Sequence, residues 1–132
     1  MKKIVAEELD LAGLYAALSD RTRLRLLNLM AGGEVCVCFF IEVLDQPQPT
    51  ISRHLAYLRK AGIVAARRDG KWIHYRINVP KDAVLRRALD DALASMRSEG
   101  SMQRDVKKLQ VACCSPRASD ILRRAPKPGS RS

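Results

Sequence analysis

The segment that most constrains the fold is QPQPTISRHLAYLRKA, residues 46–61. Pro49 suits the first position of a helix, where its missing N–H costs nothing, and Gly62 is typical of the residue that ends one. Apolar residues recur at the spacing of one buried helical stripe, formed by Ile51, Leu55 and Leu58. The segment therefore predicts a turn followed by a single helix.

The opposite face of this expected helix carries no acidic residue. Its polar side chains belong to Arg53, Tyr57 and Lys60, and Thr50 and His54 lie on its flank. Hydroxyl, imidazole and guanidinium groups near a helix N-terminus suit a negatively charged groove, because the helix dipole also favours phosphate. A basic face that is simply solvated is the alternative interpretation, and the flanking segments help to decide between the two.

The segments before this helix predict a first helix at residues 6–18, a second one capped by Ser19 or Asp20, and a third apolar stretch at residues 35–44. The turn into the basic helix then runs from Asp45 to Pro49. Two helices joined by so short a turn, the second of them basic on its outer face, form the helix-turn-helix pattern.

After Gly62 the apolar pattern changes from helical to alternating. Residues 63–67 and 71–77 predict two strands, and Asp69-Gly70 is a strong signal for the turn of a β-hairpin. The inward side of the second strand is expected to carry Ile73, Tyr75 and Ile77. The other side is expected to carry Trp72, His74 and Arg76.

The tip of this hairpin is basic, with Arg67, Arg68 and Lys71 around a single acid, Asp69. A basic hairpin directly after a helix-turn-helix predicts a wing that lies along the phosphate backbone of DNA. Such contacts position a protein on DNA without reading its sequence. An ordinary hairpin with a soluble tip is the alternative.

A broad apolar stripe at about residues 81–98 predicts a helix that must bury this stripe against another element. The first helix and its copy in a second subunit are the expected partners, which gives a C2 homodimer. The fold class is therefore mainly α with a small β-hairpin, a homodimeric winged helix-turn-helix. Its expected parts are the DNA-binding and dimerisation domain at residues 1–98, an extension at 99–114 with Cys113 and Cys114, and a disordered basic tail at 115–132.

The formal charge of +10 and the pI near 10.0 call for an acidic partner, most simply nucleic acid. A basic protein that binds membrane surfaces is the alternative. No apolar run approaches the ~20 residues needed to span a bilayer. Acidic residues near the N-terminus break any signal-peptide pattern, so a cytoplasmic protein is expected. In the reducing cytosol the four cysteines are expected to be thiols rather than structural disulfide bridges, and so to be available for metal or redox chemistry.

The stretches LSDRTRLRLLNLMAGGEVCVC and QPTISRHLAYLRKAGIVAARRDGKWIHYRI together resemble the ArsR/SmtB family of metalloregulatory repressors, roughly over residues 9–98. The resemblance implies a dimeric winged helix that binds a palindromic operator and releases it when a metal or metalloid binds. By position it assigns operator reading to Gln48, Thr50, Ser52, Arg53 and His54, beside Tyr57 on the same face. It also assigns the wing contacts to Arg67, Arg68 and Lys71.

Cys36 and Cys38 form the Cys-Val-Cys that the arsenic-sensing branch of this family uses for As(III), and soft thiolates suit such a centre. The family commonly places a third cysteine one helical turn further on, where this chain has Ile41. The local site is therefore one ligand short. Residues at i and i+2 point to different sides of a helix, so both thiolates can bind one ion only where the helix starts or bends.

Cys113 and Cys114 are the expected source of the missing ligand. One of them completes a site with Cys36 and Cys38, within or across the dimer, or else the two pairs act separately. A two-thiol site would suit a singly methylated trivalent arsenical, and antimonite is a further candidate. The alternative is that these cysteines bind no ion and serve only as small buried hydrophobic residues.

Other functions fit less well. Zinc, cobalt and nickel sensors of the family use His and carboxylates on the last dimer helix, which here has no His. A cadmium or lead sensor, a thiol-redox switch and a constitutive repressor with inert cysteines remain alternatives. An enzyme fits poorly, because the sequence shows no paired acids, Ser/His/Asp set or Gly-rich phosphate loop. His54 is expected to contact DNA and His74 to be structural.

Overall fold

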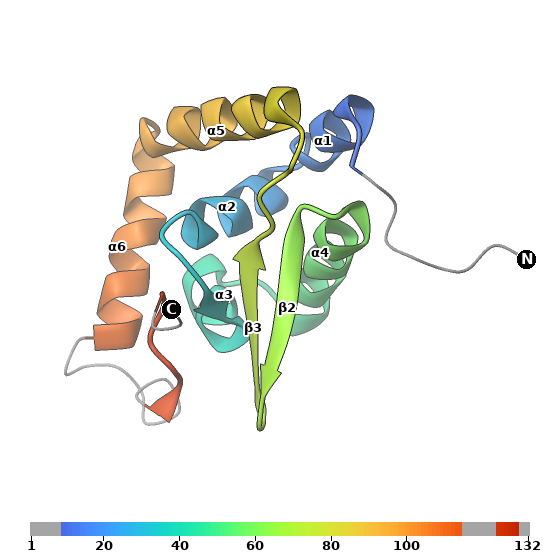
Figure 1. Cartoon of the computed structure of the whole chain (residues 1–132). Coiled ribbons are helices and arrows are strands. Elements are labelled where there is room, and N and C mark those ends of the chain that lie inside the picture. Colours follow the sequence, from blue (N-terminus) through green and yellow to red (C-terminus); the bar gives the residue numbers. More distant parts are fainter. Residues whose placement is uncertain (1–8, 115–123, 130–132) are drawn as a thin grey trace, which may run out of the picture.

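The computed structural model of this chain describes residues 9–114 and 124–129. Its elements, in chain order, are α1 (Leu11–Ala17), α2 (Arg21–Met30), β1 (Val35–Cys36), α3 (Val37–Leu44), α4 (Gln48–Ala61), β2 (Val64–Asp69), β3 (Trp72–Ile77), α5 (Ala83–Arg97) and α6 (Gly100–Cys114). Helices α1 and α5 run along one end of the molecule, and the β2–β3 hairpin projects from the other (Figure 1). This arrangement is a winged helix-turn-helix, as the sequence predicted.

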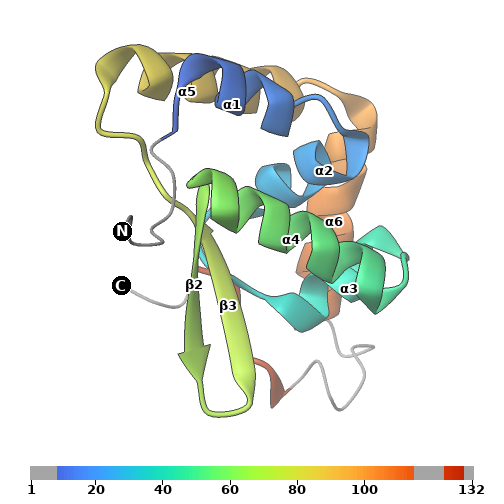
Figure 2. The ribbon, with the colours of Figure 1, turned by 90° about the vertical axis from the view of Figure 1, so that its right-hand side faces the viewer.

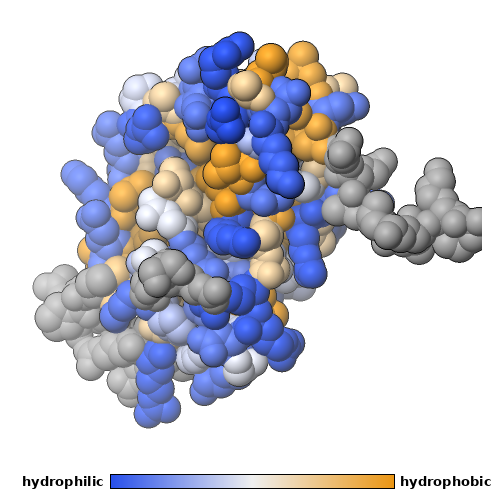
Figure 3. Space-filling view, in the orientation of Figure 1, coloured by the Kyte–Doolittle hydropathy of each residue, from blue (hydrophilic) through white to orange (hydrophobic). Residues whose placement is uncertain are grey.

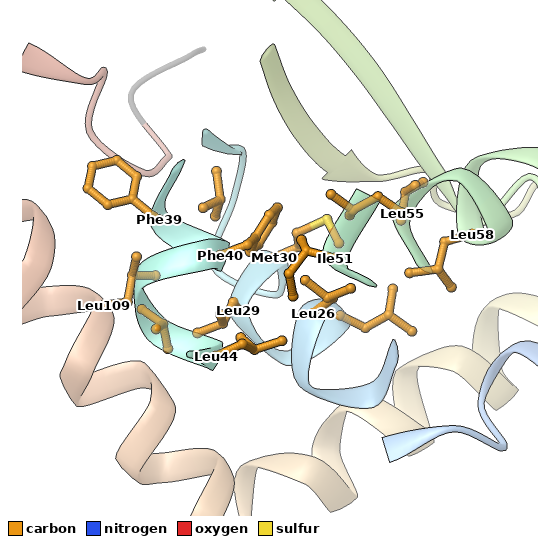
Figure 4. Packing of buried hydrophobic residues seen from close by; sticks show 14 of the residues in the cluster. Leu26, Leu29, Met30, Phe39, Phe40, Leu44, Ile51, Leu55, Leu58 and Leu109 are labelled. Carbon is orange, nitrogen blue, oxygen red and sulfur yellow. The ribbon is translucent and has the colours of Figure 1, made fainter. Parts of the chain in front are cut away.

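The hydrophobic core lies between α2, α3, α4 and the sheet (Figure 4). The predicted apolar stripe of α4 is confirmed, because Ile51, Leu55 and Leu58 are fully buried. They pack with residues such as Leu26 and Met30 of α2 and with Phe40 of α3. Burial of one face of α4 leaves its polar face turned outward, away from the core.

Side-chain caps set where the first two helices begin. Asp10 accepts the Gly13 N–H at 2.7 Å, so α1 begins at Leu11 rather than at residue 6. Asp20 accepts the Arg23 N–H at 3.0 Å and is the cap of α2, one of the two candidates that the sequence offered. Each acceptor satisfies an N–H that the first helical turn leaves unpaired.

Helix α4 begins at Gln48, one residue before the predicted start. The carbonyl of Pro47 accepts the N–H groups of Thr50 and Ile51, so Pro47 is the cap and Pro49 the second helical residue. A proline fits the first or the second position of a helix, because the N–H at each of these positions has no partner within the helix. Gly62 ends α4 with a φ of 89°, as predicted.

The sheet has three strands in the order β1-β3-β2, and all pairs are antiparallel. The predicted hairpin turn is displaced by one residue, because Asp69 pairs with Trp72 and the turn is Gly70-Lys71. Gly70 takes a φ of 60°, which glycine adopts without strain. The short strand β1 was not predicted: the Val35–Leu44 stretch was treated as one apolar segment, and its first two residues join the sheet.

Helix α6 packs along α2 and α3, and the views in Figures 1 and 2 agree on this. Arg25 binds Asp105 through two hydrogen bonds of 2.7 and 3.0 Å, and Asn28 donates to the Met102 carbonyl at 3.1 Å. These contacts place Cys113, near the end of α6, on the α3 side of the molecule.

Residues 124–129, expected to belong to a disordered tail, lie against the body of the protein. Ala125 is buried, Lys127 donates to the Cys113 carbonyl, and Gly129 donates to the Glu34 carbonyl. The remainder of the expected tail falls outside the described residues. Within the described ranges, no helix combines the length and the apolar content that crossing a bilayer requires.

Candidate functional site

The two thiols of Cys36 and Cys38 meet where strand β1 gives way to helix α3. Cys36 is the extended residue that precedes α3, with φ −72° and ψ 142°, and Cys38 lies in the first turn. Their sulfurs are 3.6 Å apart. With metal–sulfur bonds of about 2.3 Å, two sulfurs on one centre at angles of roughly 90–110° lie about 3.3 to 3.8 Å apart. The pair therefore lies at a helix start, as one shared ion requires, and its spacing fits such an ion.

The two thiols differ in acidity because one donates to the other. The hydrogen bond from the Cys38 thiol lowers the pKa of Cys36 to about 6, in spite of burial, and backbone N–H groups of Cys38, Ile73 and Val37 add to this. The same hydrogen bond, together with burial, raises the pKa of Cys38. At neutral pH the site thus holds one thiolate and one thiol, and an ion that binds both sulfurs must displace the Cys38 proton.

Cys38→Ala is expected to raise the pKa of Cys36 from about 6 towards its ordinary 9.0, because the donor is lost. The pKa can be followed by the ultraviolet absorbance of the thiolate, with Cys36→Ala as the blank for other thiols. For the wild type, the free energy of unfolding should rise between about pH 6 and 9, since the unfolded thiol still binds its proton in this range. Cys38→Ser, which keeps a hydroxyl donor, is the control, and an unchanged pKa in Cys38→Ala would contradict this account.

Among the side chains that the structure describes, none completes this pair as a third ligand. Cys113 is buried and disulfide-bonded, so the expectation that all four cysteines are free thiols is wrong for this residue. The side chain of Cys114 falls outside what the structure describes. Among the described residues, no three His, Cys, Asp or Glu side chains are arranged to hold a metal ion. Within one chain, the thiol site as described consists of Cys36 and Cys38.

The predicted DNA-reading residues of α4 divide into two groups. The exposed group comprises Gln48, Ser52, Arg53 and Tyr57. Thr50 and His54 are half-buried, and His54 lies against the start of α2, with Nδ1 3.8 Å from Asp20 and 3.5 Å from Arg23. The exposed group lies on the face of α4 that is turned away from the core.

Arg23 supports this surface and was missed as a functional residue. Its guanidinium donates to the carbonyls of Ala16 and Ala17 and stacks on the ring of Tyr57 at 4.1 Å. It was not singled out from the sequence. Contacts between different helices leave no local periodic signal that could have found it.

The three wing residues also differ in their surroundings. Arg68 and Lys71 are exposed at the tip, and the Lys71 ammonium lies 5.1 Å from the centre of the Trp72 ring. Arg67 is instead bound to Glu34, with Nη2 2.6 Å from Oε1. Glu34, a buried carboxylate, was not singled out in the sequence.

Exposed apolar side chains on α1 and α5 mark a second surface, remote from the wing. Leu11 and Tyr15 of α1 and Val84 of α5 are exposed. Figure 3 shows hydrophobic residues gathered at this end of the molecule. This surface is where the sequence placed the dimer contact.

Comparison with known proteins gives a consistent result. Residues 20–66 match the family model described as "Bacterial regulatory protein, arsR family". The chain is 45% identical over 80 residues to the arsenical resistance operon repressor of Escherichia coli, covering 60% of this chain and 68% of that protein. It is 30% identical over 104 residues to a cadmium resistance transcriptional regulatory protein CadC homolog of Staphylococcus aureus, covering 76% of this chain and 84% of that protein.

A solved structure also resembles this fold. The transcriptional repressor BigR from Xylella fastidiosa superposes with a TM-score of 0.53 at 32% identity, covering 64% of this chain and 83% of that one. The comparisons therefore agree with the winged helix-turn-helix deduced from the coordinates.

Proposed function

Because the chain belongs to the arsR family of bacterial regulatory proteins, we propose that it binds a palindromic operator as a homodimer and releases it when a trivalent arsenical binds Cys36 and Cys38. It is a DNA-binding transcriptional repressor and not an enzyme. The observation that carries the proposal is the pair of sulfurs 3.6 Å apart at the start of α3.

The chemistry of the site favours arsenic over the alternatives. Two thiolates without an imidazole suit a soft, thiophilic centre better than zinc, cobalt or nickel. The Escherichia coli relative is named for arsenical resistance, and the Staphylococcus aureus relative for cadmium resistance, so cadmium is the main competitor. With two thiolates the site suits methylarsenite. Arsenite or antimonite would take a third sulfur from Cys113 or Cys114, on the same or the partner subunit, after a thiol reductant has reduced the disulfide of Cys113.

The DNA-binding surface would combine α4 with the wing. Gln48, Ser52 and Arg53 are exposed on α4 and would read base edges, while Arg68 and Lys71 would contact phosphates. The apolar surfaces of α1 and α5 would join two subunits and fix the spacing of two reading helices. Such a dimer would act in the cytoplasm, where DNA and reduced thiols occur together.

The proposed switch uses the place of α3 in the chain. This helix begins beside the thiol pair and ends at Leu44, four residues before Gln48, where α4 begins. Replacing the hydrogen bond between Cys38 and Cys36 with two bonds to one ion would alter the start of α3 and shift the two reading helices away from their half-sites. Changing a 1:99 balance to 99:1 requires about 5.5 kcal/mol of preference of the ion for the DNA-free form.

Fluorescence anisotropy of the chain's own promoter DNA tests the proposal. The reduced protein is bound to DNA at fixed salt, since a protein of charge +10 binds any duplex at low salt, and is then titrated with arsenite, methylarsenite, cadmium and zinc. We expect release by a trivalent arsenical and not by zinc. Unrelated DNA of equal length is the control for specificity.

Each outcome identifies a function. Release by methylarsenite at lower concentration than arsenite supports a two-thiolate site, and the reverse supports three sulfurs. Release by cadmium alone would replace arsenic with cadmium as the inducer. Specific binding that ignores every ion would leave a constitutive repressor and refute the proposal.

A further inference from the structure

Glu34 ties the wing to the strand that carries the thiol pair. It lies directly before β1 and two residues before Cys36, and its side chain is only 6% exposed. The Glu34 carboxylate accepts from Arg67 twice, with Nη2 2.6 Å from Oε1 and Nε 3.1 Å from Oε2. Two-point pairs of this kind fix the orientation of both partners. The first strand of the wing is therefore anchored, by an almost buried carboxylate, to the residue that leads into the site.

A continuous row of side chains runs from the thiol pair to the same arginine. His74 of β3 is paired in register with Cys36 on one side and with Arg67 on the other. Residues directly opposite each other in an antiparallel sheet place their side chains on the same face. His74 is 2% exposed, its Nδ1 lies 3.9 Å from Glu34 Oε1, and its Nε2 has no hydrogen-bond partner among the described residues. A displacement of β1 therefore acts directly on a packed, mostly buried row.

Arg67 is engaged differently from the basic residues next to it. Its guanidinium is held by Glu34, and the same interaction raises its pKa. Arg68 and Lys71 are exposed and would remain available to phosphates. Arg67 is thus placed to set the orientation of the wing rather than to add one more phosphate contact.

We propose that Glu34 is a positioning residue that couples the thiol pair to the wing through Arg67. An arsenical bound to Cys36 and Cys38 replaces the hydrogen bond between the two sulfurs. The new bonds displace β1 and Glu34, so that Arg67 no longer holds the wing in its DNA-binding orientation. This inference rests on the proposed function and adds a second route to the one through α3 and α4. The coupling factor is the operator dissociation constant with the arsenical divided by the one without it, and this factor tests the inference.

Glu34→Gln and Arg67→Lys test the coupling. Glutamine keeps the shape of the side chain without its charge, and lysine keeps the charge without the two-point geometry. The change from a 1:99 to a 99:1 balance corresponds to a wild-type coupling factor of about 10⁴. We expect each variant to lower the wild-type factor at least about tenfold, with arsenical binding to the free protein unchanged. The double variant should lose no more than either single one, because both act through one contact.

Matched controls separate the coupling from general effects of charge. Glu42→Gln removes an exposed acid from α3, and Arg104→Lys changes an exposed arginine of α6. Both should keep the wild-type coupling factor. Thermal unfolding reports whether each variant is folded, and if Glu34→Gln is not, Arg67→Lys decides.

The outcomes distinguish this inference from the proposed function. If the wild type does not release DNA with any thiophilic ion, the proposed function fails and the inference falls with it. If the wild type responds and both variants respond equally well, only the coupling through Glu34 is refuted. Weaker arsenical binding to the free Glu34→Gln protein would also refute it, because Glu34 would then belong to the binding site itself.

Discussion

Cys36→Ser/Cys38→Ser should leave the operator bound at arsenical concentrations that fully release the wild type. Serine hydroxyls are similar in shape to thiols but are poor ligands for a soft centre. Loss of an outer-shell partner alone typically lowers metal affinity about 10- to 100-fold, so removal of both ligands should raise the arsenical concentration required by more than about 100-fold. DNA-binding anisotropy at fixed salt measures this directly.

Cys113→Ser/Cys114→Ser is the matched control for this experiment. If two sulfurs suffice, the control should respond to methylarsenite like the wild type. If a third sulfur comes from α6, the control should weaken the response to arsenite more than that to methylarsenite. Both double variants should bind the operator normally without an inducer, and release of Cys36→Ser/Cys38→Ser at wild-type arsenical concentrations would contradict the assignment of the site.

Local patterns in the sequence were sufficient for much of the fold. The stripe of Ile51, Leu55 and Leu58 predicted which face of α4 is buried, because helical periodicity depends only on neighbouring residues. The alternating pattern of the hairpin predicted two strands, with an error of one residue at the turn. The requirement that Cys36 and Cys38 lie at a helix start followed from the direction of side chains at i and i+2, and the structure meets it.

The contacts that organise the site could not be predicted in this way. Glu34 and Arg67 are 33 residues apart in the chain, and Arg25 and Asp105 are 80 apart. Such pairs form because folding brings distant elements together. Arg67 was predicted as a wing residue, but nothing in the sequence marks Glu34 as its partner. Strand β1 was missed for a related reason, since a two-residue strand is defined by its pairing with β3 and not by its own pattern.

The ion pair between Arg25 and Asp105 is expected to be a major stabilising contact of α6. The Asp105 side chain is 7% exposed, that of Arg25 is 23% exposed, and the carboxylate raises the pKa of the guanidinium. Removing one partner of a buried pair leaves the other charge uncompensated, at a cost of 3–5 kcal/mol when burial is complete. Because Arg25 is partly exposed, Asp105→Ala should lower the free energy of unfolding by about 3 kcal/mol, as measured by urea denaturation.

Two further variants separate the ion pair from simple loss of packing. Arg25→Met/Asp105→Leu removes both charges and should cost much less than Asp105→Ala, because replacing a buried pair with apolar residues is often nearly neutral. Glu99→Gln breaks the salt bridge between Glu99 and Arg21, whose side chain is 56% exposed while that of Glu99 is 48% exposed. Because both charges face solvent, this change should lower the free energy of unfolding by less than about 1 kcal/mol. If Asp105→Ala cost no more than Glu99→Gln, the pair would not be a major stabilising contact, and α6 would be held by its apolar contacts and its other hydrogen bonds. The position of Cys113 on α6 would then not depend on Arg25.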